Sequence, residues 1–248
     1  MNGFTSIVKR TIHKSANIFG FDIIKIGHFD HSLGSHLLKV FKSREIDCVL
    51  DVGANFGQYG KFLREIGYTG YILSFEPVKA VYEQLVMASE SDPKWNCFNL
   101  ALSDESQSKI INVYQGSQFC SFLDISDYAK NVWDDVGSAT KEIVNTVRLD
   151  EIFDELKNST QCSNFYLKLD TQGHDLNVFH GAKESLQHVK AMQSELSLIS
   201  VYNDMHPTYS SLSEYNKSGF YISGMFPITI EKELAVIEYD CVLVKRTA

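Results

Sequence analysis

Short apolar segments alternate along the chain with stretches whose apolar residues recur at helical spacing. Phe62, Leu63 and Ile66 show this spacing after the first apolar segment. An alternation of short strands with helices is typical of a parallel sheet whose strands are joined by crossover helices. We therefore predict an α/β fold with strands at residues 48–52, 71–76, 95–100, 165–170 and 190–196.

Two C-terminal segments and one central segment depart from this pattern. The runs "FYISGMF" (220–226) and "AVIEYDCVLVK" (235–245) predict a pair of antiparallel strands at an edge of the sheet. Residues 116–145 show little periodicity and are rich in Ser, Asp and Asn. We interpret this segment as an insertion that covers the functional edge of the sheet and that a bound ligand orders or tightens.

Length and charge limit the classes of function. A chain of 248 residues is long enough to bury the core of one large α/β domain. Its net charge of -8 argues against a general nucleic-acid-binding protein, which would carry a broad basic face. Residues 1–44 have an excess of basic residues, with seven Lys or Arg and two Asp. We predict an N-terminal helical appendage at 1–44 and a catalytic domain at 45–248.

The N-terminal segment has an amphipathic pattern. Phe4, Ile7, Val8 and Ile12 fall on one helical face, with basic residues elsewhere. This face either contacts an anionic membrane surface or docks on the catalytic domain or on a partner subunit. Docking on a partner subunit would make the protein a homo-oligomer, and the sequence leaves this alternative open. No run of 18 apolar residues occurs, and the five cysteines form no Cys-x-x-Cys pair. We expect a cytoplasmic protein without a transmembrane segment.

The first predicted strand runs into "DVGANFGQYG" (51–60), at the place where open α/β sheets bind ligands. Gly53 and Gly57 allow a tight turn and a close approach of the backbone to a ligand. Glu76 ends the second strand, 25 residues after Asp51. That separation suits a carboxylate that accepts both hydroxyls of a ribose, so we predict a nucleoside-bearing cofactor.

The sequence of this loop matches neither of two common nucleotide-binding motifs. A dinucleotide fingerprint requires Gly-x-Gly-x-x-Gly, but Asn55 and Gln58 stand where its second and third glycines would be. The Gly-Lys-Ser/Thr of a phosphate-binding loop is absent from the sequence. An acidic residue at the head of the loop, Asp51, suits a ligand that carries an amino group and a sulfonium. We therefore predict S-adenosylmethionine as the cofactor.

Four segments together, "VLDVGANFGQYG", "LSFEPV", "NLALSD" and "YLKLDTQGHDLNVFHGA", resemble the FkbM family of S-adenosylmethionine-dependent methyltransferases. The resemblance runs from about residue 45 to the C-terminus, and the last segment is the most specific. It implies a Rossmann-like class I fold, a doubly wound, mostly parallel seven-stranded sheet with an antiparallel last strand. It also implies O-methylation of a hydroxyl on a sugar, glycan or related metabolite, as in polysaccharide biosynthesis.

The resemblance also implies which residues hold the cofactor. Asp51, Gly53, Asn55 and Gly57 would surround its methionine end, and Glu76 would bind the ribose. The cofactor set is completed by residues expected beside the adenine or over the cofactor, namely Ala101, Leu102, Ser103, Asp104, Ser121 and Asp170.

Transfer to an unactivated hydroxyl calls for a base with a pKa close to neutral. His174 follows the fourth predicted strand and is the leading candidate, with Asp170 assisting and Glu195 as a further candidate. Lys168, His174 and Asp175 are the candidate substrate contacts, although Asp175 could instead cap the following helix. No paired carboxylates or Asp-Asn pair follow Asp170, so we predict that no metal takes part.

Two other functions remain open. The chain could bind an adenosyl group without catalysis, or it could act as a partner protein at a membrane surface. Turnover of S-adenosylmethionine with a hydroxylated acceptor would decide against the first. We expect a small-molecule or glycan acceptor and no nucleic acid.

Overall fold

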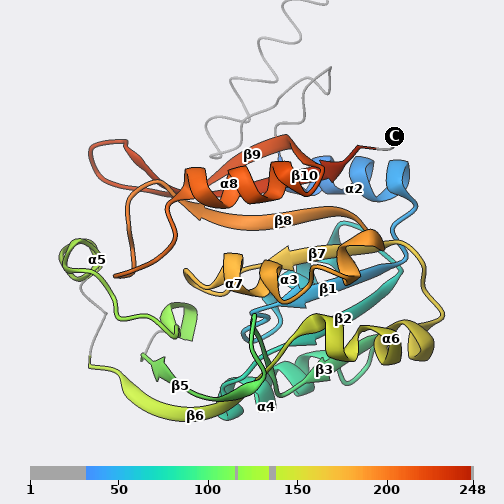
Figure 1. Ribbon diagram of the computed structural model, residues 1–248, viewed down its shortest axis with the longest axis horizontal. Coiled ribbons are helices and arrows are strands. Elements are labelled where there is room, and N and C mark those ends of the chain that lie inside the picture. Colours follow the sequence, from blue (N-terminus) through green and yellow to red (C-terminus); the bar gives the residue numbers. More distant parts are fainter. Residues whose placement is uncertain (1–31, 115–116, 134–137, 247–248) are drawn as a thin grey trace, which may run out of the picture.

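A seven-stranded sheet forms the centre of the protein, with the strand order β3-β2-β1-β7-β8-β10-β9 (Figure 1). The computed structural model describes residues 32–114, 117–133 and 138–246. The strands are β1 (Cys48–Val52), β2 (Tyr71–Phe75), β3 (Trp95–Phe98), β7 (Phe165–Leu169), β8 (Val189–Ser197), β9 (Phe220–Ile230) and β10 (Val236–Lys245). All five strands that the sequence predicts in the parallel part of the sheet are therefore present.

The strand directions also agree with the prediction. The strands β3, β2, β1, β7 and β8 pair in parallel, whereas β10 pairs antiparallel with both β8 and β9. The last strand of the chain is thus inserted between β8 and β9. The doubly wound, mostly parallel sheet with an antiparallel last strand is confirmed.

Helices cover both faces of the sheet because successive residues of the strands point to opposite faces. Val49 belongs to one hydrophobic cluster with α2 (Leu33–Arg44), α3 (Gln58–Glu65) and α4 (Lys79–Ser89). Leu50, the next residue, belongs to a second cluster with α6 (Leu149–Thr160), α7 (Asp175–His180) and α8 (Thr208–Lys217) (Figure 1). The carboxyl ends of the strands stay open between the two helical layers.

A second, three-stranded sheet was missed by the sequence analysis. It consists of β4 (Ala101–Leu102), β6 (Thr140–Val147) and β5 (Gln107–Val113), in that order. Residues 140–145 were predicted as part of an irregular insertion, and that prediction is wrong for them. The strand β6 alternates between exposed and buried positions, as Ile143 (72% exposed) and Val144 (6%) show. The type of residue hid this alternation, because the apolar Ile143 is exposed whereas the polar Thr146 is buried.

The predicted N-terminal appendage is described only from residue 32 onward. Leu37, Val40 and Phe41 of α2 are buried in the same cluster as the sheet residues Tyr166 and Val242. The segment 33–44 therefore packs against the core of the catalytic domain. The predicted amphipathic face, within residues 1–31, lies outside the described residues. Among the helices of the described part, none is long and apolar enough to cross a membrane.

Candidate functional site

A cavity of about 390 Å³ opens at the carboxyl ends of β1, β2, β7 and β8. It is the place where open α/β sheets bind ligands. The structure brings nine of the predicted site residues to its wall, namely Gly53, Asn55, Glu76, Ala101, Leu102, Ser121, Lys168, Asp170 and Glu195. The side chains of Phe75, Ile111 and Phe122 add an apolar wall.

The glycine-rich turn after β1 passes very close to β7. Gly53 has a φ of +79°, and a Cβ atom at this position would lie 1.9 Å from the carbonyl oxygen of Asp170. Asn55 also adopts a positive φ, 48°. Gly57 begins α3 with a φ of +84°, and it faces Leu85 and Trp95 instead of the cavity. The turn therefore needs Gly53 for both its conformation and its close approach to β7.

Glu76 joins this turn to the end of β2. Its Oε2 accepts a hydrogen bond from the backbone N–H of Asn55, and its Oε1 accepts one from Val78, both at 3.0 Å. Burial raises the pKa of Glu76 to about 7, although the two backbone hydrogen bonds oppose the shift. The carboxylate is thus fixed at the cavity wall and changes its protonation near neutral pH.

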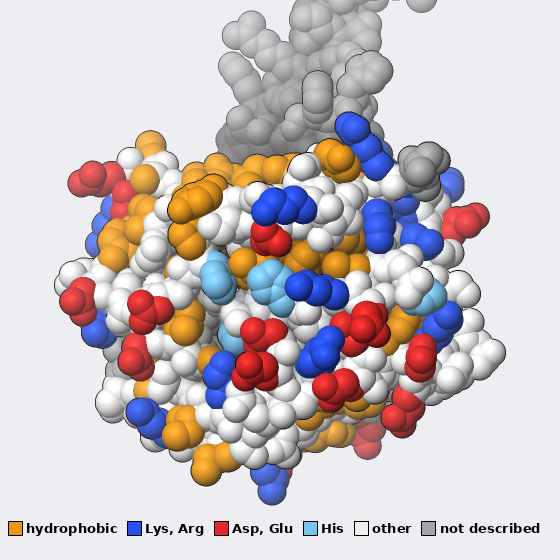
Figure 2. Space-filling view, viewed as in Figure 1, with side chains coloured by type: hydrophobic (Ala, Val, Ile, Leu, Met, Phe, Trp, Pro, Cys, Tyr) orange, Lys and Arg blue, Asp and Glu red, His pale blue; other side chains and the backbone are white. Residues whose placement is uncertain are grey.

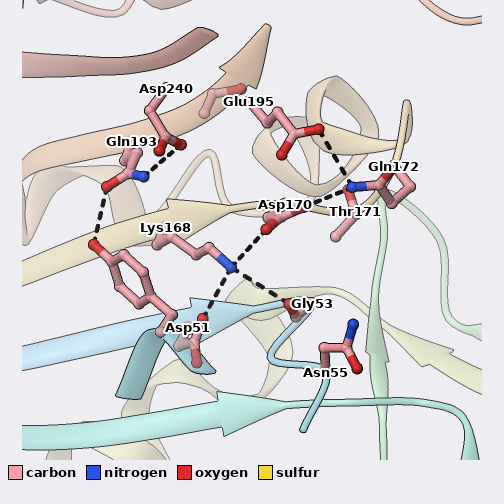
Figure 3. Close-up of polar contacts among 12 residues, drawn as sticks. Asp51, Gly53, Asn55, Lys168, Asp170, Thr171, Gln172, Gln193, Glu195 and Asp240 are labelled. Atoms are coloured by element: carbon pink, nitrogen blue, oxygen red, sulfur yellow. Dashed lines mark hydrogen bonds and ion pairs between the residues drawn. The ribbon is translucent and has the colours of Figure 1, made fainter. Parts of the chain in front are cut away.

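Lys168 lies at the base of the cavity between three oxygen acceptors (Figure 3). Its Nζ is 3.0 Å from Asp170 Oδ2, 3.3 Å from Asp51 Oδ1 and 3.4 Å from the carbonyl oxygen of Gly53. Burial disfavours the charged lysine, but Asp170 and Asp51 outweigh it and raise the pKa of Lys168 above its ordinary value. Asp51 itself is fully buried below the cavity and also accepts a hydrogen bond from Ser74.

A polar chain that the sequence analysis missed lies on the β8 and β10 side of the cavity. Gln193 Oε1 accepts hydrogen bonds from the hydroxyls of Tyr59 (2.9 Å) and Tyr166 (3.2 Å). Gln193 Nε2 donates to Asp240 Oδ1 at 2.7 Å (Figure 3). Polar residues inside the apolar runs of β8 and β10 were the available signal in the sequence.

His174 does not reach the cavity wall in this structure. It is 3% exposed, and its Nε2 lies 2.9 Å from Ser103 Oγ. Because the Ser103 hydroxyl donates to Asp104 Oδ1, the His174 Nε2 must carry a proton and donate. Asn177 of α7 donates to the other oxygen of Asp104. Ser103 and Asp104, predicted beside the adenine, therefore connect the end of β4 to α7 and are not among the cavity-lining residues.

The electrostatics of His174 also differ from those expected of a general base. Burial lowers the pKa of its imidazole to about 4, and Lys109 adds to this shift. The ring of Phe122, which does line the cavity, packs edge-on against the imidazole at 4.9 Å between centroids. The geometry therefore places His174 as a neutral, buried side chain next to the cavity.

Asp175 neither contacts the cavity nor caps α7. Its Oδ1 accepts hydrogen bonds from the backbone and hydroxyl groups of Thr171, at 2.7 and 2.6 Å. Its Oδ2 accepts one from Ser194 at 2.8 Å. These contacts close the turn that follows β7, and Asp175 is not among the residues that line this cavity.

The described part of the 116–145 segment contributes Gln118, Cys120, Ser121 and Phe122 to the cavity wall, and residues 117–133 are called the cover. It contains a 3-10 helix at Ser117–Phe119 and α5 (Asp127–Val132). Ser121 Oγ donates to the carbonyl oxygen of Gln172 at 2.6 Å, and Tyr202 donates to the side chain of Gln172 at 2.8 Å. Gln172 Nε2 in turn donates to Asp170 at 2.9 Å. The cover is thus hydrogen-bonded to the turn that carries the predicted catalytic residues.

The cavity combines an apolar side with an acidic side. Glu76 and the apolar wall suit a nucleoside, because the carboxylate can accept from a ribose diol and the wall can pack on a base. Across the described ranges, 32–114, 117–133 and 138–246, no three His, Cys, Asp or Glu side chains are grouped so that they could hold a metal ion.

Comparisons with solved structures found distant likenesses. The structure of an rRNA methylase from Streptococcus thermophilus is 10% identical, covers 90% of this chain and 100% of its own, and has a TM-score of 0.46. Aeropyrum pernix fibrillarin, solved with natively bound S-adenosyl-L-methionine, is 11% identical over 84% of this chain and 74% of its own, with a TM-score of 0.44. Likenesses this distant carry no information about the substrate.

The search of curated proteins found no significant match. The model of the methyltransferase FkbM domain, in contrast, matches residues 51–217, about two thirds of the chain. This range contains the glycine-rich turn, Glu76 and the turn after β7. The chain therefore belongs to the FkbM family of methyltransferases.

Proposed function

We propose that this methyltransferase transfers the methyl group of S-adenosylmethionine to a hydroxyl of a sugar, glycan or related metabolite. The observation that carries the proposal is the position of Glu76. Its carboxylate is held at the cavity wall by two backbone N–H groups, directly beside the tight turn at Gly53. A carboxylate placed in this way can accept hydrogen bonds from both hydroxyls of a ribose.

The remaining donor and acceptor groups fit the other parts of this cofactor. Ala101, Leu102 and Phe122 offer an apolar surface for the adenine. The backbone at Gly53 and the carboxylate of Asp170 also line the cavity and are available to the amino acid end. Bound S-adenosylmethionine would supply a methyl group on a positively charged sulfur, the electrophile of the reaction. The protein's own contribution is to align the acceptor with it and to exclude water.

A hydroxylated acceptor is favoured by the polar groups on the β8 and β10 side of the cavity. Gln193, Glu195 and Asp240 line this side, and their side chains can donate to and accept from hydroxyls. On the face seen in Figure 2, basic and acidic side chains are intermixed and form no continuous basic surface. A small molecule or glycan therefore suits this protein better than a nucleic acid, which requires such a surface.

The cofactor proposal is tested by calorimetry with S-adenosylmethionine and S-adenosylhomocysteine. We expect both to bind, and Glu76→Ala to weaken both by on the order of 2 kcal/mol through loss of charge-assisted hydrogen bonds. Glu83→Ala, at an exposed position of α4, is the matched control and should bind like the wild type. Equal affinities for Glu76→Ala and wild type would contradict the role of Glu76, and tight binding of NAD instead would contradict the whole proposal.

Catalysis is tested with labelled methyl donor and a panel of free monosaccharides, nucleotide sugars and oligosaccharides. We expect label in at least one hydroxylated sugar, at a rate that EDTA does not change. Binding of the cofactor without any transfer would instead indicate a non-catalytic adenosyl-binding module. Activity lost in EDTA and restored by magnesium would contradict the metal-independent mechanism.

A further inference from the structure

Gln193 is held in one orientation by its partners. The side chain is 2% exposed, and two tyrosine hydroxyls, those of Tyr59 and Tyr166, point at its Oε1. Burial raises the pKa of both phenols well above the ordinary value, so both remain protonated donors. The carbonyl end of the amide must therefore face the tyrosines, and the NH₂ end must face Asp240.

This orientation fixes one oxygen of Asp240 and leaves the other available. Oδ1 accepts from Gln193 Nε2 at 2.7 Å, whereas within the described parts of the chain no group donates to Oδ2. Asp240 lines the cavity, and its register partner on β8 is Glu195, which lines it too. Residues directly opposite in an antiparallel pair project from the same face of the sheet. Both carboxyl groups thus line the β8 and β10 side of the cavity, where Glu195 Oε1 also accepts from Gln172 Nε2 at 3.3 Å (Figure 3).

The environment raises the proton affinity of both groups. Burial raises the pKa of Asp240 to about 6, while the hydrogen bond from Gln193 opposes the shift. Burial, and then the nearby charge of Asp170, raise the pKa of Glu195 well above its ordinary value. The hydrogen bond from Gln193 thus favours the charged form of Asp240, and a pKa of about 6 suits a group that accepts a proton near neutral pH.

Charged groups on several elements act on Asp240 electrostatically. They are Asp170 and Lys168 at the end of β7 and Asp175 on α7, and the charge of Asp240 acts in turn on Glu195 of β8 and Tyr59 of α3. Lys168 is already paired with two other carboxylates, and from β9 the register partner is the uncharged Phe226. The charge on Asp240 is thus balanced by hydrogen bonding and not by a contacting cation.

We propose that Asp240 is the proton acceptor for the acceptor hydroxyl and that Gln193 is its positioning residue. The inference deepens the proposed function and rests on it. The hydroxyl proton passes to Asp240 Oδ2, the freed lone pair of the oxygen forms the bond to the methyl carbon, and the electron pair of the broken carbon–sulfur bond stays on the thioether. Asp240 later releases the proton to water.

The other candidate bases are less well placed. Both oxygens of Asp170 are already engaged, Oδ2 by the Lys168 ammonium at 3.0 Å and Oδ1 by Gln172 Nε2 at 2.9 Å. Burial and the nearby charge of Asp170 favour the protonated form of Glu195, and His174 lies outside the cavity wall with its Nε2 engaged. Asp240 combines a place on the cavity wall, a pKa of about 6 and an oxygen that accepts from no group in the described parts of the chain.

The first test uses the full chain and Asp240→Asn. With the panel sugar that takes up most label, we expect turnover to fall roughly 100-fold or more. Calorimetric affinity for S-adenosylhomocysteine should stay within about twofold of the wild type, because the change is at the acceptor end. Asp127→Asn, at an exposed carboxylate on α5, is the control for the same chemical change. Turnover of Asp240→Asn above about one tenth of wild type would overturn the proposal.

The second test measures proton affinity without turnover. Carbon-13 carboxyl NMR of the complex with S-adenosylhomocysteine should show one aspartate that titrates near pH 6 and disappears in Asp240→Asn. Gln193→Leu removes a hydrogen bond to the charged form, so this titration and the acidic limb of the pH–rate profile should both move to higher pH. A merely structural role of Gln193 would move neither. An Asp240 that titrates near pH 4 or below would overturn the proposal.

Different results would contradict the proposed function and the role of Asp240. If S-adenosylhomocysteine does not bind the wild-type protein, the proposed function fails. If it binds and label is transferred, but Asp240→Asn behaves like the wild type, only the role of Asp240 fails. A magnesium requirement abolished by Asp240→Asn would also overturn the proposal, because it would make this carboxylate a metal ligand.

Discussion

Lys168 and Asp51 are register partners on the parallel strands β7 and β1, and the Lys168 Nζ lies 3.3 Å from Asp51 Oδ1. Both side chains are almost completely buried. Asp170 takes part as well, with its Oδ2 3.0 Å from the same ammonium. Of the described residues that line the cavity, Lys168 is the only Lys or Arg, so it neutralises the acidic groups at its base.

We expect Lys168→Met to lower the free energy of unfolding by about 3 to 5 kcal/mol, because it leaves two carboxylates near the core without their cation. Denaturant unfolding measures the change. Lys130→Met removes an exposed ion pair to Asp127 on α5 and should have little effect. Similar effects of the two substitutions would contradict the role of the buried pair.

Gly53→Ala should destabilise the protein by more than about 2 kcal/mol, because it adds backbone strain at a positive φ to a clash with the Asp170 carbonyl. Gly67 is the matched control. It has a φ of +94°, and a Cβ atom added there would meet no atom within 4 Å, so Gly67→Ala isolates the backbone cost of about 1 kcal/mol. We also expect Gly53→Ala to bind S-adenosylhomocysteine at least tenfold more weakly. Equal losses of stability would show that the close approach to β7 is unimportant.

His174 predicts a defined pH dependence of stability. Its pKa is about 4 in the folded protein and near 6.5 in an unfolded chain, so the unfolded state takes up a proton first as the pH falls. From pH 7.5 to pH 5 this linkage should remove about 2 kcal/mol from the free energy of unfolding. His174→Gln should abolish this component. The pH–rate profile of methyl transfer by His174→Gln should keep its acidic limb. Loss of that limb in this variant would indicate that His174 is the general base.

The cover over the cavity should respond to ligand. Ser121 and Tyr202 hold Gln172 from the cover and from the segment after β8, so a ligand in the cavity would stabilise the closed arrangement. We expect saturating S-adenosylhomocysteine to slow proteolysis within residues 117–133 about tenfold. Ser121→Ala should weaken this protection. Cleavage that is unaffected by the ligand would argue against a cover coupled to binding.

Several features followed from the sequence because they depend on local chemistry. Apolar runs marked the parallel strands, and the spacing of Asp51, Gly53 and Glu76 predicted a nucleoside-type site at the first turn. All three residues lie at the carboxyl end of β1 or β2, as predicted. The positions of turns after strands were also predictable, including the turn that carries Asp170 and His174.

The direction in which the side chains of that turn point was not predictable. His174 faces Ser103, which is 71 residues away in the chain, and Asp175 faces Ser194. Hydrogen-bonding partners so distant in sequence are chosen by packing, and one sequence does not reveal them. The polar chain from Tyr59 through Gln193 to Asp240 has the same origin, since its members are separated by 134 and 47 residues.

The sequence by itself determined the sheet, the glycine-rich turn and the acidic residue at the end of β2, because strand formation and turn conformation are set by neighbouring residues. Only the tertiary structure decided which carboxyl groups line the β8 and β10 side of the cavity. Asp240 stands opposite Glu195 because β10 is inserted antiparallel between β8 and β9, and a shift of that register by one residue would turn Asp240 to the other face of the sheet.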